Sequence, residues 1–196
     1  TRVKGSRFPV ATNLFGSVRR MELAMGPKPE AIIKQAVSAL HQLMPPRLST
    51  LWQERHWLIP AARSGLRTIP AAKAPVLQNR ISPVDLTALP VLTSWQEDGG
   101  PFLTLPLVYT EHPVTGEHNL GMYRVQIYSE NQTGMHWQIH KGGGFHYYEA
   151  EQNGHALPVT VFLGGPPALT IAAITALPEP LPELLYASFL MGDKID

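Results

Sequence analysis

The sequence predicts an α+β protein in which a helical, mixed N-terminal segment precedes a twisted, mostly antiparallel sheet or split barrel. Apolar residues recur at helical spacing between positions 32 and 43, and from Val91 short strand-like runs alternate with Gly, Pro and Asp. The 19 prolines are about twice the usual share of roughly 5 per cent. This proline content argues against a compact helical bundle.

Charge and composition narrow the classes of partner. Lysine and arginine number 16 against 15 aspartates and glutamates, so there is no electrostatic basis for binding nucleic acid or an anionic membrane surface. The apolar runs are too short to cross a bilayer, and the first residues lack a signal-peptide pattern. The absence of cysteine excludes disulfides and thiolate chemistry, which fits a cytoplasmic protein.

Proline and capping residues mark the expected helix boundaries. Ser17 is a suitable N-cap for a helix through Met25, and Pro29 begins the most regular helical pattern, which ends at Pro45. Three later helices are expected over 144–153, 168–175 and 182–191.

Apolar runs at 75–81, 102–110 and 157–163 predict strands, and the last is apolar enough to predict a buried one. Turn residues between 82 and 90 predict a domain junction. We therefore expect residues 1–81 to belong to an N-terminal α/β domain and residues 82–196 to a second, split-barrel domain. The final residues, 192–196, carry no pattern that closes an element, so a fragment of a longer protein is expected.

The centre of the sequence predicts a β-hairpin, because β-branched and aromatic residues flank a polar turn. With the turn centred near 131–132, Tyr123 would lie opposite His140 and Arg124 opposite Ile139.

This register would bring Asn119, Arg124 and His140 together at the end of the hairpin far from the turn. Asn119 and Arg124 differ by an odd number, so a regular strand would point them to opposite faces. A bulge at Gly121 could re-aim one of them.

His136 and His140 have the spacing of two zinc ligands on a helix, but a zinc hydrolase would have Glu where Trp137 stands. In a strand, the same spacing separates the two residues by about 13 Å, too far for one ion. We do not expect a zinc site. His140 and Asn119 together supply an imidazole nitrogen and an amide oxygen, which suit a hard or borderline ion such as Mn²⁺.

Several motifs occur in a fixed order along the chain: Asn119-Leu-Gly-Met-Tyr-Arg124, His140-Lys-Gly-Gly, Pro158-Val-Thr-Val-Phe-Leu-Gly-Gly, Pro167-Ala-Leu and Leu177-Pro-Glu. On these motifs the sequence resembles the UbiD family of reversible decarboxylases, which use prenylated flavin mononucleotide. The resemblance runs from about Phe8 to the C-terminus. It implies a split-barrel flavin domain similar to that of flavin reductases.

The resemblance also implies a cofactor site. In the family an Asn, a His and a Glu hold the metal that binds the cofactor phosphate, and Asn119 and His140 match the first two. The Glu belongs to a segment downstream of Gly192, so we expect the Mn²⁺ site of this chain to be incomplete, and K⁺ is a further candidate cation. The cofactor-binding residues that the resemblance implies are Thr104, Asn119, Gly121, Met122, Tyr123, Arg124, Ile139, His140, Thr175 and Ala176.

Arg124 is the expected catalytic residue. A guanidinium pairs with a carboxylate through two hydrogen bonds and stays charged, so Arg124 could orient the acid that loses carbon dioxide. Without the motif, a surface arginine paired with an acid would be the better interpretation. The acidic residues that work with this arginine in the family have no counterpart in the sequence. Trp95, Asp98 and Gly99 fit the family pattern, and we expect them to serve a turn and packing.

The resemblance implies decarboxylation of an aromatic or α,β-unsaturated acid, of the hydroxybenzoate or naphthoate type used in ubiquinone or menaquinone biosynthesis. A flavin prenyltransferase would supply the cofactor, the intact enzyme would be a homo-oligomer, and this chain alone would be inactive. Two alternatives stay open. The chain could be a truncated, non-catalytic flavin-binding module, or a flavin reductase using ordinary FMN.

Overall fold

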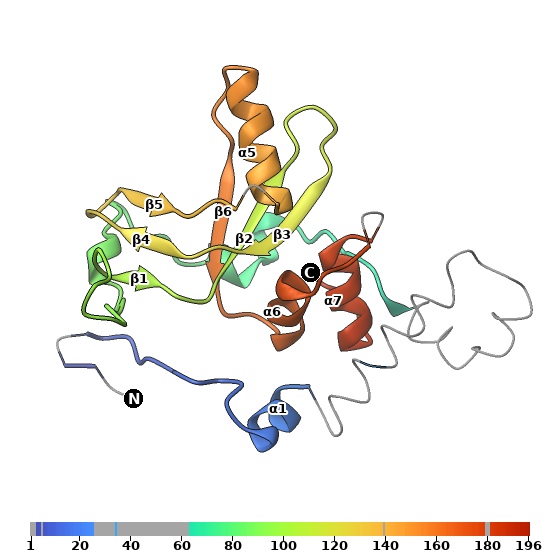
Figure 1. The fold of residues 1–196 in the computed structure, drawn as a ribbon. Coiled ribbons are helices and arrows are strands. Elements are labelled where there is room, and N and C mark those ends of the chain that lie inside the picture. Colours follow the sequence, from blue (N-terminus) through green and yellow to red (C-terminus); the bar gives the residue numbers. More distant parts are fainter. Residues whose placement is uncertain (1–2, 5, 26–33, 35–62, 139, 179–180) are drawn as a thin grey trace, which may run out of the picture. The chain divides into compact units, whose positions relative to one another are not determined.

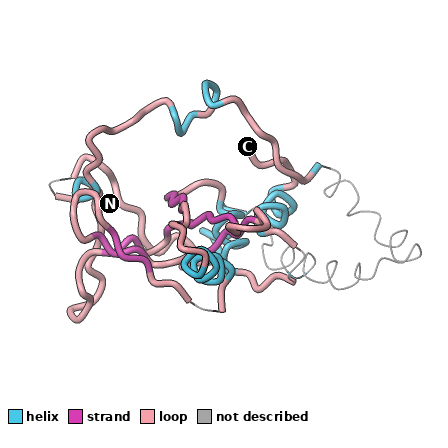
Figure 2. The backbone as a smooth tube through the Cα atoms, turned by 90° about the horizontal axis from the view of Figure 1, so that it is seen from above, coloured by secondary structure: helices cyan, strands magenta, loops and turns pink. Residues whose placement is uncertain are grey.

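The structure is a computed structural model that describes residues 3–4, 6–25, 34, 63–138, 140–178 and 181–196 (Figure 1). The chain divides into two compact units, one of Thr1–Thr12 and Ile69–Gly165, the other of Asn13–Thr68 and Pro166–Asp196. Helices and strands alternate with long loops along the described backbone (Figure 2). The expected helix that begins at Pro29 lies outside the described residues.

The first sheet of the Ile69–Gly165 unit contains the expected hairpin. Its strands are β1 (Phe102–Leu103), β4 (Val125–Ile127) and β5 (Thr133–Met135), in the antiparallel order β1-β4-β5 (Figure 1).

The predicted register of this hairpin is wrong by three residues, because Val125 pairs with Met135 and Arg124 lies opposite His136. The turn is earlier than expected: the backbone N–H groups of Tyr128 and Ser129 both donate to the carbonyl of Gln132.

The second sheet has the antiparallel order β3-β2-β6, with β2 at Pro106–Glu111, β3 at His118–Met122 and β6 at Val159–Leu163. The strand expected over 102–110 is therefore two strands in different sheets, broken just before Pro106. Asn119 also lies in this second sheet and not in the hairpin. The chain crosses from one sheet to the other at Tyr123 and Arg124.

Strand β6 has the expected position, but the prediction that it is buried is wrong. Within the described residues it pairs with β2 alone, and its exposed fractions include 39% at Val161 and 53% at Leu163. An apolar run indicates a strand without indicating how many neighbours cover it. The part of the sheet away from β6 is covered, since helix α5 (Gly142–Gln152) packs on β2 and β3. The core of this unit is formed by Leu107, Val108, Leu120, Tyr123, Val125, Ile127 and Ala150.

The expected strand at 75–81 is also wrong. Residues Pro75–Leu77 form a short 3-10 helix, preceded by another at Ala71–Lys73, and a third lies at Leu86–Ala88. Pro75 takes the first helical position, where its fixed φ fits and its lack of an N–H costs nothing. Val76 is 80% exposed, and no strand among the described residues covers this apolar run.

The Asn13–Thr68 and Pro166–Asp196 unit holds three described helices. Helix α1 (Val18–Met25) starts as expected, with the Ser17 hydroxyl accepting the N–H of Arg20 at 3.3 Å. Helices α6 (Pro167–Ile174) and α7 (Glu183–Met191) pack on each other. Small buried side chains allow their close approach, namely Ala168, Ala172, Ala173 and Ala187.

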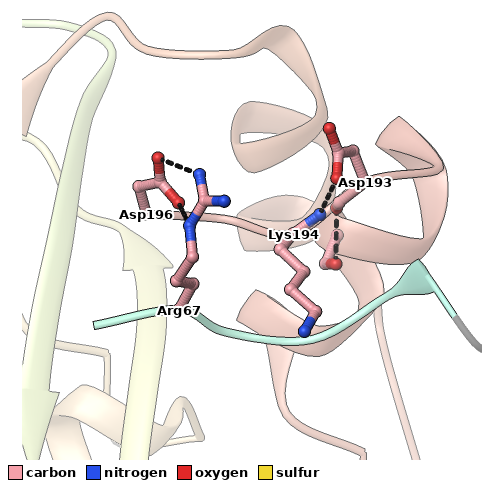
Figure 3. A network of polar contacts seen from close by, with 5 residues as sticks. Arg67, Asp193, Lys194 and Asp196 are labelled. Atoms are coloured by element: carbon pink, nitrogen blue, oxygen red, sulfur yellow. Dashed lines mark hydrogen bonds and ion pairs between the residues drawn. The ribbon is translucent and has the colours of Figure 1, made fainter. Parts of the chain in front are cut away.

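Residues 192–196 contact an earlier segment of this unit, although the sequence pattern predicted no regular structure for them. Gly192 ends α7 in the left-handed conformation, and Ile195 forms a parallel bridge with Leu66. Arg67 binds Asp196 through two hydrogen bonds of 2.6 and 2.7 Å (Figure 3). The backbone between 64 and 67 is therefore joined to the end of the chain.

The described architecture confirms the predicted α+β class with mostly antiparallel sheets. It places the central motif at the crossing between two sheets, beside the first turn of α5.

Candidate functional site

Arg124 lies at the crossing between the two sheets, after β3 and before β4. Its Nη2 donates to Oδ2 of Asp98 at 2.6 Å, and its guanidinium carbon lies 3.6 Å from the centroid of the Phe102 ring. The hydrogen bond from Arg124, followed by its positive charge, lowers the pKa of Asp98. The Arg124 side chain keeps 39% exposure, against 11% for Asp98. The structure thus presents an arginine side chain that is held by Asp98 and Phe102 and is partly accessible.

Asn119 lies in β3, paired with Thr110 of β2. Its side chain packs so tightly against the start of α5 that a Cβ at Gly142 would overlap it. The Asn119 Nδ2 is buried and has no hydrogen-bond partner among the described residues. Because the two ends of an amide exchange on rotation, either the amide N–H₂ or the amide oxygen can take this unpartnered position.

Tyr123 connects the crossing to α5. Its phenol oxygen accepts the backbone N–H of Gly143 at 3.0 Å, and its ring lies 5.0 Å from that of Trp137. A Cβ at Gly121 would overlap the Tyr123 ring. Gly121 pairs regularly with Val108, so the bulge expected there is not formed. This glycine makes room for an aromatic ring.

The first turn of α5 begins with glycines and has no side-chain cap. Lys141 is the N-cap, and its side chain makes no capping hydrogen bond. Helix N-termini favour anions such as phosphate, because their first backbone N–H groups have no partner within the helix. The N–H of Gly143 is used by Tyr123, whereas Gly142 lies against Asn119 and has no side chain that would block an approaching group.

His140 is exposed and lies in the turn that leads into α5, two residues before Gly142. Asn119 packs against Gly142, and His140 lies two residues before Gly142, so both predicted metal ligands are near the start of α5. Within the described ranges, no group of three or more His, Cys, Asp or Glu is arranged to hold a metal.

The other predicted site residues are spread over the molecule. Thr104 is exposed in the turn between β1 and β2, and Met122 ends β3 half-buried. Ile139 lies outside the described residues. Thr175 and Ala176 follow α6 in the other unit, where the Thr175 hydroxyl donates to the carbonyl of Ile171 at 2.7 Å.

A second polar cluster fixes α5 on the sheet, and the motifs give no indication of it. Thr110 and His146 are both buried, with 3.0 Å between Oγ1 and Nδ1. The His112 ring meets the His146 ring edge-on at 5.3 Å. Burial, followed by the charge of His112, lowers the pKa of His146.

Sequence reasoning gave Asp98 only a turn and packing role. It does have that role, because its carboxylate accepts the N–H of Trp95 at 3.2 Å, but the same carboxylate also binds Arg124. The signal available in the sequence was an acid in a family motif. Asp98 and Arg124 are 26 positions apart in the sequence, so they meet only when the sheet forms.

Residues 67–196 match the family described as the 3-octaprenyl-4-hydroxybenzoate carboxy-lyase Rift-related domain, and residues 1–40 match the N-terminal domain of the same carboxy-lyase. The chain therefore belongs to the UbiD family. Among the described residues, no helix has the length and apolar character needed to span a membrane.

A curated relative agrees with this membership. A Chlamydia pneumoniae protein that carries the name of a 4-hydroxybenzoate decarboxylase component is 49% identical over 193 residues, which are 98% of this chain and 32% of that protein. The chain thus spans about a third of the length of this curated relative.

Two solved structures share the fold. An evolved dimeric form of the UbiD-class enzyme HmfF from Pelotomaculum thermopropionicum, in complex with prFMN, matches with a TM-score of 0.79 at 24% identity, over 98% of this chain and 41% of HmfF. The vanillic acid decarboxylase of Sedimentibacter hydroxybenzoicus matches with a TM-score of 0.74 at 19% identity, over 97% and 39%.

Proposed function

We propose that the complete protein containing this chain catalyses the reversible, non-oxidative decarboxylation of an aromatic or α,β-unsaturated acid with prenylated FMN. The observation that carries the proposal is Arg124, which is charged, partly accessible and fixed between Asp98 and Phe102. Membership of the UbiD family supplies the reaction class. The cofactor is supported by the prFMN bound to HmfF.

A hydroxybenzoate- or naphthoate-type acid of quinone biosynthesis is the proposed substrate. The name of the Chlamydia pneumoniae relative and the description of the family both point to a 4-hydroxybenzoate-type acid. The aromatic surroundings of Arg124, with Phe102 beneath its guanidinium, suit an aromatic carboxylate.

In this reaction the chain's own residues bind and orient. Arg124 donates paired hydrogen bonds to the substrate carboxylate and keeps its positive charge, which directs the acid towards one face of the site. When bound, prenylated FMN supplies the electron sink for the electrons left by departing carbon dioxide. The return of a proton is assigned to acidic residues outside this chain.

Cofactor binding is assigned to the start of α5 and its neighbours. The N-terminal end of this helix favours the cofactor phosphate, and Asn119 and His140 would hold Mn²⁺ together with ligands from elsewhere in the complete protein. K⁺ is a second candidate cation. We further propose that a flavin prenyltransferase supplies the cofactor, and that the enzyme is a cytoplasmic homo-oligomer inactive when reduced to this chain.

The test is a carbon dioxide release assay on the complete gene product, produced with and without a flavin prenyltransferase. The proposal predicts release from carboxyl-labelled 4-hydroxybenzoate, or from a hydroxynaphthoate, only when the prenyltransferase is present. Flavin binding without turnover of any such acid would indicate a non-catalytic module. Pyridine-nucleotide oxidation with ordinary FMN, independent of Mn²⁺, would indicate a flavin reductase.

A further inference from the structure

Three side chains from separate segments form one assembly around Arg124. The carboxylate of Asp98 lies 2.6 Å from Nη2, and the Phe102 ring lies under the guanidinium at 3.6 Å. Phe102 pairs with Gln126, which lies two residues after Arg124, so Phe102, Gln126 and Arg124 point to the same face of the sheet. A charge-assisted hydrogen bond and a ring contact together restrict the position of the guanidinium.

Asp98 is itself held in place by the turn that carries it. Its carboxylate accepts the N–H of Trp95 at 3.2 Å, and its own N–H donates to the Trp95 carbonyl at 3.2 Å. The next residue, Gly99, is tied to the sheet because its carbonyl accepts Nε2 of Gln126 at 2.7 Å. The carboxylate is therefore placed by backbone contacts that do not depend on Arg124.

We propose that Asp98 is the positioning residue for Arg124, holding the guanidinium over the Phe102 ring so that its remaining N–H groups meet the carboxylate of an aromatic acid. This inference rests on the proposed function. An arginine has five N–H donors, and the contact with Asp98 uses Nη2, which leaves donors for a second carboxylate. Holding a reacting group in a productive orientation contributes more to rate than to binding, because misplacement by about 1 Å can cost about 100-fold.

A competing role for Asp98 predicts the opposite effect of removing it. If Asp98 instead occupied the place of the incoming carboxylate, its removal would free Arg124 and improve substrate binding. The 39% exposure of the Arg124 side chain favours the positioning role, because the side chain is partly accessible with Asp98 in place.

The kinetic test uses the complete, cofactor-loaded protein with Asp98→Ala, Asp98→Asn and the conservative variant Asp98→Glu. Glu97→Gln is the matched control, since Glu97 is the exposed neighbour in the same turn. We expect kcat to fall about 10- to 100-fold in the Ala and Asn variants, with KM changing much less and bound flavin unchanged. Asp98→Glu should recover part of kcat. An unchanged kcat, or a higher kcat/KM, in Asp98→Ala would overturn the positioning role.

A second readout does not depend on turnover. In the ¹⁵N-arginine-labelled protein, a guanidinium held by Asp98 should show slowed rotation and separate Nη signals for Arg124, which should merge in Asp98→Asn and persist in Glu97→Gln. Signals that are already merged in the wild-type protein would overturn the inference. If no acid is decarboxylated by the wild-type enzyme, the proposed function fails while this spectrum still decides whether Asp98 holds Arg124.

Discussion

The phenol oxygen of Tyr123 accepts a hydrogen bond from the backbone N–H of Gly143 at 3.0 Å, in a position where Tyr123 is 3% exposed. This contact joins the crossing between the two sheets to the first turn of α5. Residues that carry the proposed chemistry lie on either side of it, with Arg124 adjacent in sequence and Asn119 packed against Gly142.

Tyr123→Phe should therefore destabilise the chain, because the buried N–H of Gly143 loses its acceptor. An unsatisfied buried donor costs about 1–3 kcal/mol in the free energy of unfolding. Urea denaturation measures the change, and Tyr128→Phe is the control at a position that is 64% exposed. Equal stability of the two variants would show that the contact contributes little.

Gly142→Ala should weaken cofactor binding, because the new methyl group would overlap the side chain of Asn119. Fluorescence titration of the complete protein with prenylated FMN in the presence of Mn²⁺ would measure the affinity, which we expect to fall at least about tenfold, or by about 1.4 kcal/mol. Lys141→Ala, at the exposed N-cap, should bind as the wild type does. Wild-type affinity in Gly142→Ala would separate Asn119 from the cofactor site.

Arg124→Ala in the complete protein should abolish turnover while much of the cofactor stays bound. The guanidinium that orients the substrate carboxylate is lost, whereas Asn119 and the start of α5 are unchanged. Arg124→Lys keeps the charge but not the planar pair of donors, so it should recover little activity. Turnover and flavin content measured on the same samples decide the matter, and a fully active Arg124→Ala enzyme would exclude Arg124 from the mechanism.

His146 should make the stability of the chain depend on pH. Its pKa is lowered in the folded state, so on acidification the unfolded chain takes up the proton first, from about its ordinary value of 6.5. The free energy of unfolding should consequently fall as the pH drops through 6.5 towards the lower folded pKa. The groups that face His146 are Thr110, His112 and Glu117, of which the charge of Glu117 opposes the shift.

His146→Gln keeps a side chain able to bind Thr110 and cannot be protonated. Its melting temperature should vary less between pH 5 and pH 7 than that of the wild type. The difference should correspond to the uptake of at most about one proton on unfolding. His155→Gln, at an exposed position, is the control. An identical pH profile in His146→Gln and the wild type would assign the dependence to other groups.

Ser188 should contribute more to the stability of the Asn13–Thr68 and Pro166–Asp196 unit than the exposed ion pair near it. It is fully buried, its hydroxyl oxygen accepts the N–H of Gly65 at 2.7 Å, and it donates to the carbonyl of Asp193 at 2.7 Å. Ser188→Ala leaves both groups without this hydroxyl and should cost about 1–3 kcal/mol in the free energy of unfolding.

Arg67→Ala removes the neighbouring ion pair with Asp196, which is exposed (Figure 3). Exposed pairs are screened by salt and contribute little, so Arg67→Ala should be less destabilised than Ser188→Ala. At high salt, Arg67→Ala should be as stable as the wild type. Denaturation curves at low and high salt compare the two variants. A larger loss of stability in Arg67→Ala than in Ser188→Ala would show that the ion pair contributes more than the Ser188 hydroxyl.

Local patterns predicted the helices near the C-terminus and the hairpin, because capping residues, prolines and apolar periodicity act within a few residues. The starts of α1, after Ser17, and of α6, with Pro167 in its first turn, follow from such local signals. The hairpin register could not be predicted from the same patterns. A change in where the turn closes, at Gln132, moves every pair along the ladder, so Arg124 faces His136 and not Ile139.

The site depended on contacts between residues distant in sequence. The motifs singled out Asn119, Arg124 and Gly142, but the packing of Asn119 on Gly142 and the pairing of Arg124 with Asp98 arise only when separate strands meet. Strand β6 illustrates the same limit, since an apolar sequence predicted burial and its place at the edge of the sheet leaves it exposed.

Native mass spectrometry of the complete protein, produced together with a flavin prenyltransferase, tests most directly whether this chain carries the cofactor site of a UbiD decarboxylase. The account predicts one prenylated FMN and one Mn²⁺ per protein, both lost in Asn119→Ala and retained in Lys141→Ala. A wild-type protein that binds no flavin, or an Asn119→Ala variant that keeps both cofactor and metal, would contradict it.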